Sequence, residues 1–349
     1  MAEDMIKLLS KAYELKASDL HLNVGVPPII RVDGKLQPMN DVPLTGKEIE
    51  ALGLSILPEK ETEMLKKDRE LDLSIDVEGV SRFRANFFWQ MDTLSASFRA
   101  IPHVIPSSEE LGLPEVALTL ADLPRGLVIV TGPTGSGKST TLAAMIDHIN
   151  STRSEHIITV EDPIEYLHKQ KKSVISQREV GHDTLSFTNA LKYALRQDPD
   201  VVLVGEMRDL NTVQSTITIA ETGHLVLATL HTNSAVEAID RMIDIFPPHQ
   251  QNQVRTQLSF ILQGVLTQQL LAKIGGGRAL AMEVLIPNAA VRTLIREGKT
   301  HQVLSQMQMG QGESKMITMD QALSKLVKSG MIDKETALKR ASDKESLIG

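Results

Sequence analysis

The chain has 349 residues, of which 42% are hydrophobic and 23% are charged, and its formal net charge is −7 at pH 7. These values fit a globular protein long enough for two domains. The negative charge argues against nucleic acid as a partner, and the absence of cysteine excludes disulfides and thiolate metal sites. No apolar run is long enough to span a bilayer, so we expect a cytoplasmic protein that reaches a membrane only through partners.

Residues 1–100 are expected to form a small α+β domain. Apolar residues among the first fifteen positions repeat at helical spacing, which predicts an N-terminal helix. Residues 29–32 and 35–36 flank the turn residues Asp33-Gly34, and residues 71–77 alternate before the turn at Glu78-Gly79. Both stretches therefore predict β-hairpins.

Residues 101–122 contain three prolines and are expected to be a linker with one short helix. Beyond them, four apolar runs, GLVIV, HIITV, VVLV and HLVLATL, are separated by helical segments. This alternation predicts an α/β domain over residues 123–349, with a parallel-rich sheet covered on both faces. From about residue 235 we expect mostly helix, including one that begins after Thr318 and ends at Gly330.

A phosphate-binding loop is predicted where the segment GPTGSGKS fits the G-x-x-x-x-G-K-[ST] pattern between a strand and a helix. Loop N–H groups and the helix N-terminus suit phosphate oxygens. Lys138 is expected to reach the β- and γ-phosphates of ATP, and the Ser139 hydroxyl to bind Mg²⁺. The residues expected to contact the nucleotide are Gly132, Pro133, Thr134, Gly135, Ser136, Gly137, Lys138, Ser139 and Thr140.

Two glutamates follow predicted strands. The run VVLV leads into Gly205 and Glu206, so glycine stands where many such proteins carry a Mg²⁺-binding aspartate, and a second strand leads into Glu161. Because strand C-terminal ends converge on the ligand crevice, we expect both glutamates to face the γ-phosphate. One would deprotonate or orient the attacking water, with Glu206 favoured, and the other would hold Mg²⁺ through water. Alternatively, Glu161 only caps the turn at Pro163.

Two histidines bracket the run HLVLATLH. His231 ends the strand at the crevice and is expected to hydrogen-bond the γ-phosphate, while His224, which precedes the strand, is a weaker candidate for the same chemistry. Opposite ends of one strand are too far apart to share a metal ion.

Three arginines of the first domain are candidates for contact with the transferred phosphoryl group. Arg82 and Arg84 alternate on one face of SRFRANFFW, and Arg99 lies on the next predicted strand. A solvated polar face is the simpler interpretation. Beside a phosphate-binding domain, however, arginines can accelerate transfer by roughly 10³–10⁵ in the best cases.

The motifs GPTGSGKSTT, TVEDPIEYLH, VVLVGEMRDL and TGHLVLATLHT, in this order, resemble the secretion ATPase superfamily of type II secretion and type IV pili. The stretch ASDLHLNVGVPPIIRVDGKL is similar to the N-terminal PAS-like domain of that family. The stretch VRTLIREGK, residues 291–299, resembles the AIRNLIRE motif of its pilus retraction branch, with Val291 and Thr293 as departures. The resemblance extends over nearly the whole chain.

The resemblance implies a RecA-like ATPase domain, a homo-hexameric ring, ATP and Mg²⁺ as cofactors, and a motor that drives pilus retraction through an inner-membrane platform protein. It matches the Walker A motif to residues 132–139, an acidic box to 161–165, Walker B to 201–206 and a histidine box to 222–231. It also implies a cytoplasmic protein docked at the pilus base.

Other interpretations stay open. The departures in the retraction motif leave room for a paralogous accessory retraction ATPase, which is also a possible partner. The lack of a four-cysteine zinc motif disfavours an extension or secretion ATPase. A nucleotide-dependent regulator without turnover and a nucleic-acid translocase are rivals of other classes. Spacing alone describes residues 291–299 as a surface helix, with Arg292, Arg296 and Glu297 pointing outward.

Overall fold

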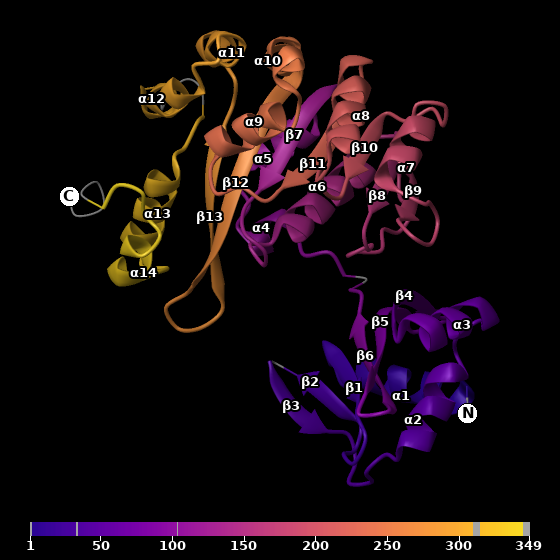
Figure 1. The fold of residues 1–349 in the computed structure, drawn as a ribbon. Helices are drawn as coiled ribbons and strands as arrows, with labels where there is room; N and C mark the ends of the chain where they lie inside the picture. The colour runs from indigo at the N-terminus through magenta and orange to yellow at the C-terminus, as the bar shows by residue number, and fades with distance from the viewer. Residues whose placement is uncertain (1, 33, 103, 310–314, 345–349) are drawn as a thin grey trace. The chain divides into compact units, whose positions relative to one another are not determined.

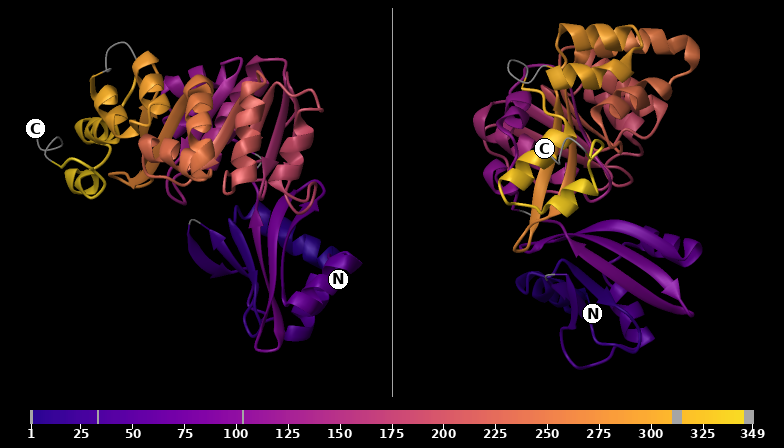
Figure 2. Two further views of the ribbon diagram at one scale, coloured as in Figure 1. Left: turned by 45° about the horizontal axis from the view of Figure 1, so that its top comes forward. Right: turned by 90° about the vertical axis from the view of Figure 1, so that its left-hand side faces the viewer.

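The computed structural model describes residues 2–32, 34–102, 104–309 and 315–344. The chain forms two compact units, Met1–His103 and Val104–Gly349, which are described one after the other (Figures 1 and 2). None of the helices in the described ranges has the length and apolar character needed to cross a membrane.

The N-terminal unit is an antiparallel sheet of six strands, in the order β3-β2-β1-β6-β5-β4, with helices packed on it (Figure 1). Both predicted hairpins are confirmed, because β2 pairs with β3 and β4 pairs with β5. The elements are α1 (Ala2–Glu14), β1 (Asp19–Leu22), β2 (Ile29–Val32), β3 (Lys35–Pro38), α2 (Gly46–Leu54), α3 (Glu59–Asp68), β4 (Glu70–Val77), β5 (Ser81–Gln90) and β6 (Thr93–Ala100).

Alternation along β5 separates the two faces of this sheet. Phe83, Ala85 and Phe87 are buried in the core, where the Phe87 ring meets that of Phe98 edge to face at 5.6 Å between centroids. The intervening arginines therefore share the other, polar face, as the sequence predicts.

The C-terminal unit is built on a seven-stranded sheet in the order β13-β12-β7-β11-β10-β8-β9. Every pairing is parallel except that of β13 with β12. Its strands are β7 (Gly126–Thr131), β8 (His156–Glu161), β9 (Val174–Glu179), β10 (Val201–Val204), β11 (Leu225–Leu230), β12 (Leu262–Ala272) and β13 (Arg278–Leu285).

Helices cover both faces of this sheet, which confirms the predicted α/β class (Figure 2). Apolar residues of α7 to α11 pack on one face, and those of α5 and α6 pack on the other. The helices are α4 (Ser108–Leu111), α5 (Glu115–Ala121), α6 (Lys138–Thr152), α7 (Phe187–Ala194), α8 (Leu210–Glu221), α9 (Ala235–Asp244), α10 (Pro248–Ile261), α11 (Ala289–Arg296), the 3₁₀ turn η1 (Thr300–Gln302), α12 (Val303–Met309), α13 (Met319–Lys328) and α14 (Lys334–Leu338).

Two segments differ from the sequence-based expectation. Beyond residue 235 the chain contains the expected helices, but residues 262–285 form the β12–β13 hairpin instead of helix, and its turn uses positive φ at three consecutive glycines, 275–277. Most of β12 is buried on both faces, and its polar residues do not alternate regularly with apolar ones, so the sequence has no strand-like period. The expected linker, residues 101–122, contains two helices, and the buried residues of α5 pack into the core of the C-terminal unit.

Glu283 is a buried carboxyl group that joins three elements. Its Oε1 accepts hydrogen bonds from the N–H of Ala235 at 2.7 Å and from Thr267 Oγ1 at 3.3 Å, and its Oε2 accepts from the N–H of Met319 at 3.3 Å. Ala235 and Met319 begin α9 and α13. Burial raises the pKa of Glu283, although these hydrogen bonds oppose the shift. One side chain on β13 thus holds the first turns of two helices.

Helix α11 contains most of the stretch that resembles the retraction motif, and one expectation about it is wrong. Arg292 does not point outward: it is half-buried, and its Nη1 donates to the carbonyl oxygens of Ser259 at 2.8 Å and Phe260 at 3.2 Å. These carbonyls lie in the last turn of α10, where a helix presents unpaired acceptors and negative partial charge. Arg296 and Glu297 are exposed, as expected.

Candidate nucleotide-binding site

The predicted phosphate-binding loop connects β7 to α6. Three of its glycines have positive φ, +145° at Gly132, +78° at Gly135 and +90° at Gly137, a region that other residues adopt only with strain. Gly137 is the N-cap of α6. The unpaired N–H groups and the positive end of the helix dipole therefore lie at the loop, which has the backbone geometry of an anion site.

The side chain of Lys138 folds back onto this loop. It is 8% exposed, and its Nζ donates to the carbonyl oxygens of Gly132 at 2.9 Å and Pro133 at 3.2 Å. Burial lowers the pKa of Lys138, and the carboxylate of Glu206 opposes that shift. A phosphate group would offer this ammonium stronger, anionic acceptors than the two carbonyls do.

His231 connects the lysine to the acidic residue of the third motif. Lys138 Nζ lies 3.3 Å from His231 Nδ1, and His231 Nε2 lies 3.2 Å from Glu206 Oε1. Because an ammonium group only donates, Nδ1 accepts, so we assign the ring proton to Nε2, which donates to Glu206. The strand ends of β7, β11 and β10 thus bring three separate motifs into one chain of contacts.

Glu206 is held in its ionised form. Its Oε2 lies 2.7 Å from Arg208 Nη2, on the side away from the histidine contact at Oε1. Burial alone would raise its pKa, but the hydrogen bonds from Arg208 and His231 and the positive charge of Arg208 bring the pKa of Glu206 below its usual value. This carboxylate is suited to hold a dipole or a cation rather than to take up a proton near neutral pH.

The packing of Gly205 explains why no aspartate stands at that position. A Cβ atom there would lie 3.1 Å from the Cα of Glu161 and 3.1 Å from the carbonyl oxygen of Val160, both on β8. Thr229 of β11 also donates a hydrogen bond to the Gly205 carbonyl. A side chain at residue 205 would require the backbone of β8 to give by a few tenths of an ångström, so this position favours glycine, and the acidic groups stand at the next residue and on the neighbouring strand.

Glu161 ends β8, the strand beside β10. Its Oε1 accepts from Thr159 Oγ1 at 2.7 Å and from Gln177 Nε2 at 3.5 Å, and its Oε2 accepts from the N–H of Glu165 at 3.4 Å. Burial nevertheless raises the pKa of Glu161 to about 7. The two glutamates therefore differ in character, and Glu161 is the one that exchanges a proton near neutrality.

A divalent cation at this site would need oxygen atoms from a nucleotide and from water. Within the described ranges, no group of three or more His, Cys, Asp and Glu side chains is arranged to hold a metal ion. Ser139 is exposed in the first turn of α6, and the Oγ1 of its neighbour Thr140 lies 2.9 Å from Tyr166 Oη. One hydroxyl beside phosphate oxygens and carboxylate-bound water is the donor set that Mg²⁺ commonly uses.

His224 is not part of this cluster. It precedes β11, at the end of the strand opposite His231. Its Nδ1 lies 3.1 Å from both Thr222 Oγ1 and the carbonyl oxygen of Ile219, in the last turn of α8. Within one chain, His224 therefore closes a helix end, and the structure separates it from the loop that His231 contacts.

The candidate arginines lie on the polar face of the N-terminal sheet. Arg84 stands opposite Arg99, Arg99 opposite Asp19, and Asp19 opposite Arg31, so these four residues form one row across four strands. Arg99 Nε donates to Asp19 Oδ1 at 2.9 Å. Arg82 lies two residues from Arg84 on the same face. The row carries three positive charges and one negative charge, and Asp72 and Asp76 of β4 lie beside it on the same face.

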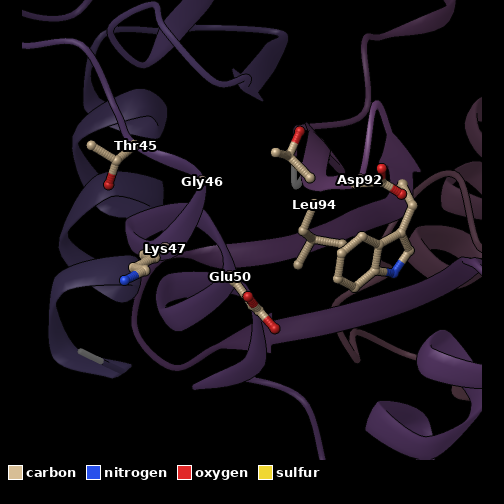
Figure 3. Close-up of a pocket in the computed structure, with 8 residues that line it drawn as sticks. Thr45, Gly46, Lys47, Glu50, Asp92 and Leu94 are labelled. Carbon is tan, nitrogen blue, oxygen red and sulfur yellow. The ribbon is translucent and has the colours of Figure 1, made fainter.

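The N-terminal unit also contains a cavity of 460 Å³ at the start of α2 and the β5–β6 turn (Figure 3). It is lined by Thr45, Gly46, Lys47, Glu50, Trp89, Asp92, Thr93 and Leu94. The first turn of α2 is closed by a capping box between Thr45 and Glu48, and the lining carries charges of both signs. The capping box occupies the N–H groups of Thr45 and Glu48 at this helix start, which makes it a weaker anion site than the glycine loop after β7.

Sequence reasoning assigned no role to three residues that the structure brings to these sites, Arg208, Asp19 and Gln268. Arg208 follows Glu206 by two positions, so a basic residue close behind the strand end was an available signal. Gln268 lies on β12 and donates to the loop carbonyl of Ser136 at 2.8 Å. Residues 262–272, which form β12, lie in the region that was expected to be mostly helical. The three glycines after β12 were the signal for a hairpin.

Comparison with known proteins identifies the group to which these features belong. The family model described as type II/IV secretion system protein matches residues 2–276. The type IV pilus retractation ATPase PilT of Pseudomonas aeruginosa is 50% identical over 343 residues, covering 98% of this chain and 99% of that protein. A twitching motility protein of Neisseria gonorrhoeae is 48% identical over 321 residues, covering 92% of this chain and 86% of that protein.

Two further comparisons concern a second type of pilus ATPase and a solved structure. The type IV pilus ATPase PilU of Pseudomonas aeruginosa is 41% identical over 342 residues, covering 98% of this chain and 89% of that protein. A crystal structure of the pilus retraction motor PilT with bound ADP matches with a TM-score of 0.91 and 52% identity, covering 97% of each chain. The similarity to PilT proteins thus extends through both units.

Proposed function

The chain belongs to the type II/IV secretion system protein family, and from that premise we propose that it is an ATP-hydrolysing motor that powers retraction of a type IV pilus. Pilin subunits would leave the base of the fibre, and the cell would gain twitching motility. We propose that six copies form a ring on the cytoplasmic side of the inner membrane. The ring would pass its movement to a platform protein there.

The observation that carries the proposal is the contact chain from Lys138 through His231 to Glu206. It connects the phosphate-binding loop with polar side chains at the C-terminal ends of two other strands, β11 and β10. A γ-phosphate that takes Lys138 from His231 would change the contacts of Glu206 as well. These contacts between Lys138, His231 and Glu206 therefore support a site that distinguishes ATP from ADP.

In the proposed reaction, water attacks the γ-phosphorus, the bond to the ADP oxygen breaks, and a proton of the water passes to a carboxylate. The loop N–H groups and Lys138 hold the phosphates. Glu161 suits the proton transfer because its pKa of about 7 lets it lose and regain a proton near neutral pH. Glu206 suits the orientation of the water, because its low pKa keeps it ionised. This assignment replaces the expectation that Glu206 is the base.

Mg²⁺, when bound, would neutralise charge on the phosphate oxygens. Ser139 would hold it through its hydroxyl, and Glu206 and Glu161 would hold it through water. Arg82, Arg84 and Arg99 are proposed as donors to the transferred phosphoryl group, with Arg99 exchanging the carboxylate of Asp19 for a phosphate oxygen.

Phosphate release by the purified full chain tests the enzymatic part of the proposal. Lys138→Ala and Glu206→Gln should lower the rate by about 10² or more. Lys172→Ala, which removes an exposed lysine of the same unit, should leave the rate unchanged. A wild-type rate no higher than that of the first two variants would favour a regulator without turnover, and stimulation by DNA would favour a translocase.

The ring and the direction of action need separate tests. Specific activity that rises with protein concentration would support assembly into the active form, and a flat dilution series would count against it. Pilus retraction in cells that depend on this chain should be lost with Arg296→Ala while ATP hydrolysis continues. Lys328→Ala, which removes an exposed lysine of α13 outside this stretch, is the control and should retain retraction. Retraction that needs a second retraction ATPase as well would indicate an accessory role, and restored pilus growth would indicate an extension motor.

A further inference from the structure

Gln268 forms the floor of the phosphate-binding loop. It is 1% exposed, and its Nε2 donates to the carbonyl oxygen of Ser136 at 2.8 Å. Thr267 pairs with Thr131 in the register of β12 and β7, so Gln268 comes directly beside Gly132. Among the described residues, no other polar side chain of β12 forms a hydrogen bond with the loop.

Two glycines of the loop lie so close to Gln268 that a Cβ atom on either would contact it. A Cβ atom at Gly132 would overlap the carbonyl oxygen of Gln268. A Cβ atom at Gly137 would lie 3.3 Å from Gln268 Nε2. The loop therefore rests on Gln268 at its first glycine, at Ser136 and at its last glycine, whereas Pro133, Thr134 and Gly135 are exposed.

The hydrogen bond from Gln268 fixes the orientation of one peptide group. The carbonyl of Ser136 and the N–H of Gly137 belong to the same planar trans peptide and point in opposite directions. Because the carbonyl points to β12, the N–H of Gly137 points away from it. Gly137 has φ of +90° and no side chain, so little else in the residue itself prevents this peptide from turning over.

Unpaired polar atoms at the same place also point to a ligand-dependent arrangement. Gln268 Oε1 and Ser136 Oγ are buried and have no hydrogen-bond partner within the described residues. Buried polar groups without partners are uncommon and costly to a folded protein. They lie on either side of the hydrogen bond that joins Gln268 to the carbonyl oxygen of Ser136.

We propose that Gln268 is a positioning residue of the nucleotide site, and that its carboxamide holds the Ser136–Gly137 peptide with the N–H directed at a nucleotide phosphate. The inference rests on the proposed nucleotide-binding function of residues 132–139. Gln268 acts through the loop backbone, so it affects how tightly the site binds the phosphate groups that ADP and ATP have in common. The rate of the chemical step, which depends on the two glutamates, is left largely as it is.

Substitution of Gln268 tests this directly in the assembled full chain. Gln268→Met keeps the length of the side chain and removes the donor, and we expect the dissociation constant for Mg·ADP to rise about five- to tenfold, as loss of one buried hydrogen bond implies. Gln268→Glu adds a negative charge beside the loop and should weaken binding more. The KM for ATP should rise in parallel, with kcat changed less than twofold.

Gln269→Met is the matched control, because Gln269 follows on the same strand with its side chain on the other face and also has a buried Oε1 without a partner among the described residues. It should bind Mg·ADP within twofold of the wild type. Calorimetric titration measures the binding, and circular dichroism confirms that each variant is folded. If Gln268→Met does not fold, Gln268→Asn, whose shorter side chain places the donor out of reach of Ser136, is held to the same fivefold criterion.

Three results separate this inference from the proposed function. Binding of Mg·ADP by Gln268→Met within twofold of the wild type would overturn it, as would an equal loss in Gln269→Met or a lower kcat with unchanged KM. Lys138→Ala is measured in the same series. If it binds Mg·ADP as the wild type does, the nucleotide site itself is wrong, whereas loss of binding in Lys138→Ala alone refutes only the role of Gln268.

Discussion

Thr159 offers a way to move the pKa of Glu161 without changing the carboxyl group itself. It is fully buried, and its hydroxyl donates to Glu161 Oε1 at 2.7 Å. This bond stabilises the ionised form, so Thr159→Val, which has nearly the same shape, should raise the pKa of Glu161 further above about 7. A hydrogen bond to a charged group contributes about 1.5–3 kcal/mol, which corresponds to a shift of roughly one to two pKa units.

The consequence for activity follows from the sign of the shift. A general base acts when it is deprotonated, so kcat of the wild type should rise with pH through about 7. In Thr159→Val the rise should occur about one unit higher, which leaves only about a tenth of the base ionised at neutral pH, where the wild type has about half. The rate at neutral pH should then fall about fivefold, while the plateau at high pH stays the same.

The assay is steady-state ATP hydrolysis at saturating nucleotide across the pH range. Thr216→Val is the control, because Thr216 is also fully buried and bonds only to the carbonyl of Thr212 within α8. A profile of Thr159→Val that coincides with that of the wild type, or that moves to lower pH, would refute the assignment. A wild-type profile without a titration near neutrality would show that Glu161 is not the base.

Three further predictions concern buried and paired groups. Glu283→Ala strands three donors in the interior and should lower the free energy of unfolding by roughly 2–4 kcal/mol in urea titrations, and a change below about 0.5 would contradict its role as a junction. Arg292→Ala removes the donor to the last carbonyl groups of α10 and should lower the free energy of unfolding by about 1–2 kcal/mol, whereas Arg296→Ala should change it by less than about 0.5 kcal/mol. Asp19→Asn should lower the KM for ATP by up to about fivefold by releasing Arg99, and the effect should vanish in an Arg99→Ala background.

The sequence was informative where a single segment decides the outcome. Each of the four apolar runs became a parallel strand, because a strand buried on both faces is apolar along most of its length. The meeting of Lys138, His231 and Glu206 followed from the rule that strand C-terminal ends share one edge of the sheet. Cap signals such as Thr318 with Gln321 also specified a helix start correctly.

The sequence was silent where the outcome depends on register. Whether Asp19 stands opposite Arg99, or Gln268 beside the loop, is decided by which residues pair across strands that lie far apart in the chain. Helical periodicity placed Arg292 outward, but the end of α10 approaches that side and offers it carbonyl oxygens. Glu283 gave no signal at all, because its donors come from three distant segments.

The position of Glu283 has a mechanical consequence. The segment from His231 to Ala235 is only a few residues long, so a shift of the histidine on phosphate binding or release would displace the first turn of α9. That turn is tied through a single carboxyl group to the first turn of α13, more than eighty residues later in the chain. Neither helix can move alone without leaving a buried donor unpaired. A displacement of the first turn of α9 would therefore reach the first turn of α13 through the Glu283 carboxyl group as well as along the intervening backbone.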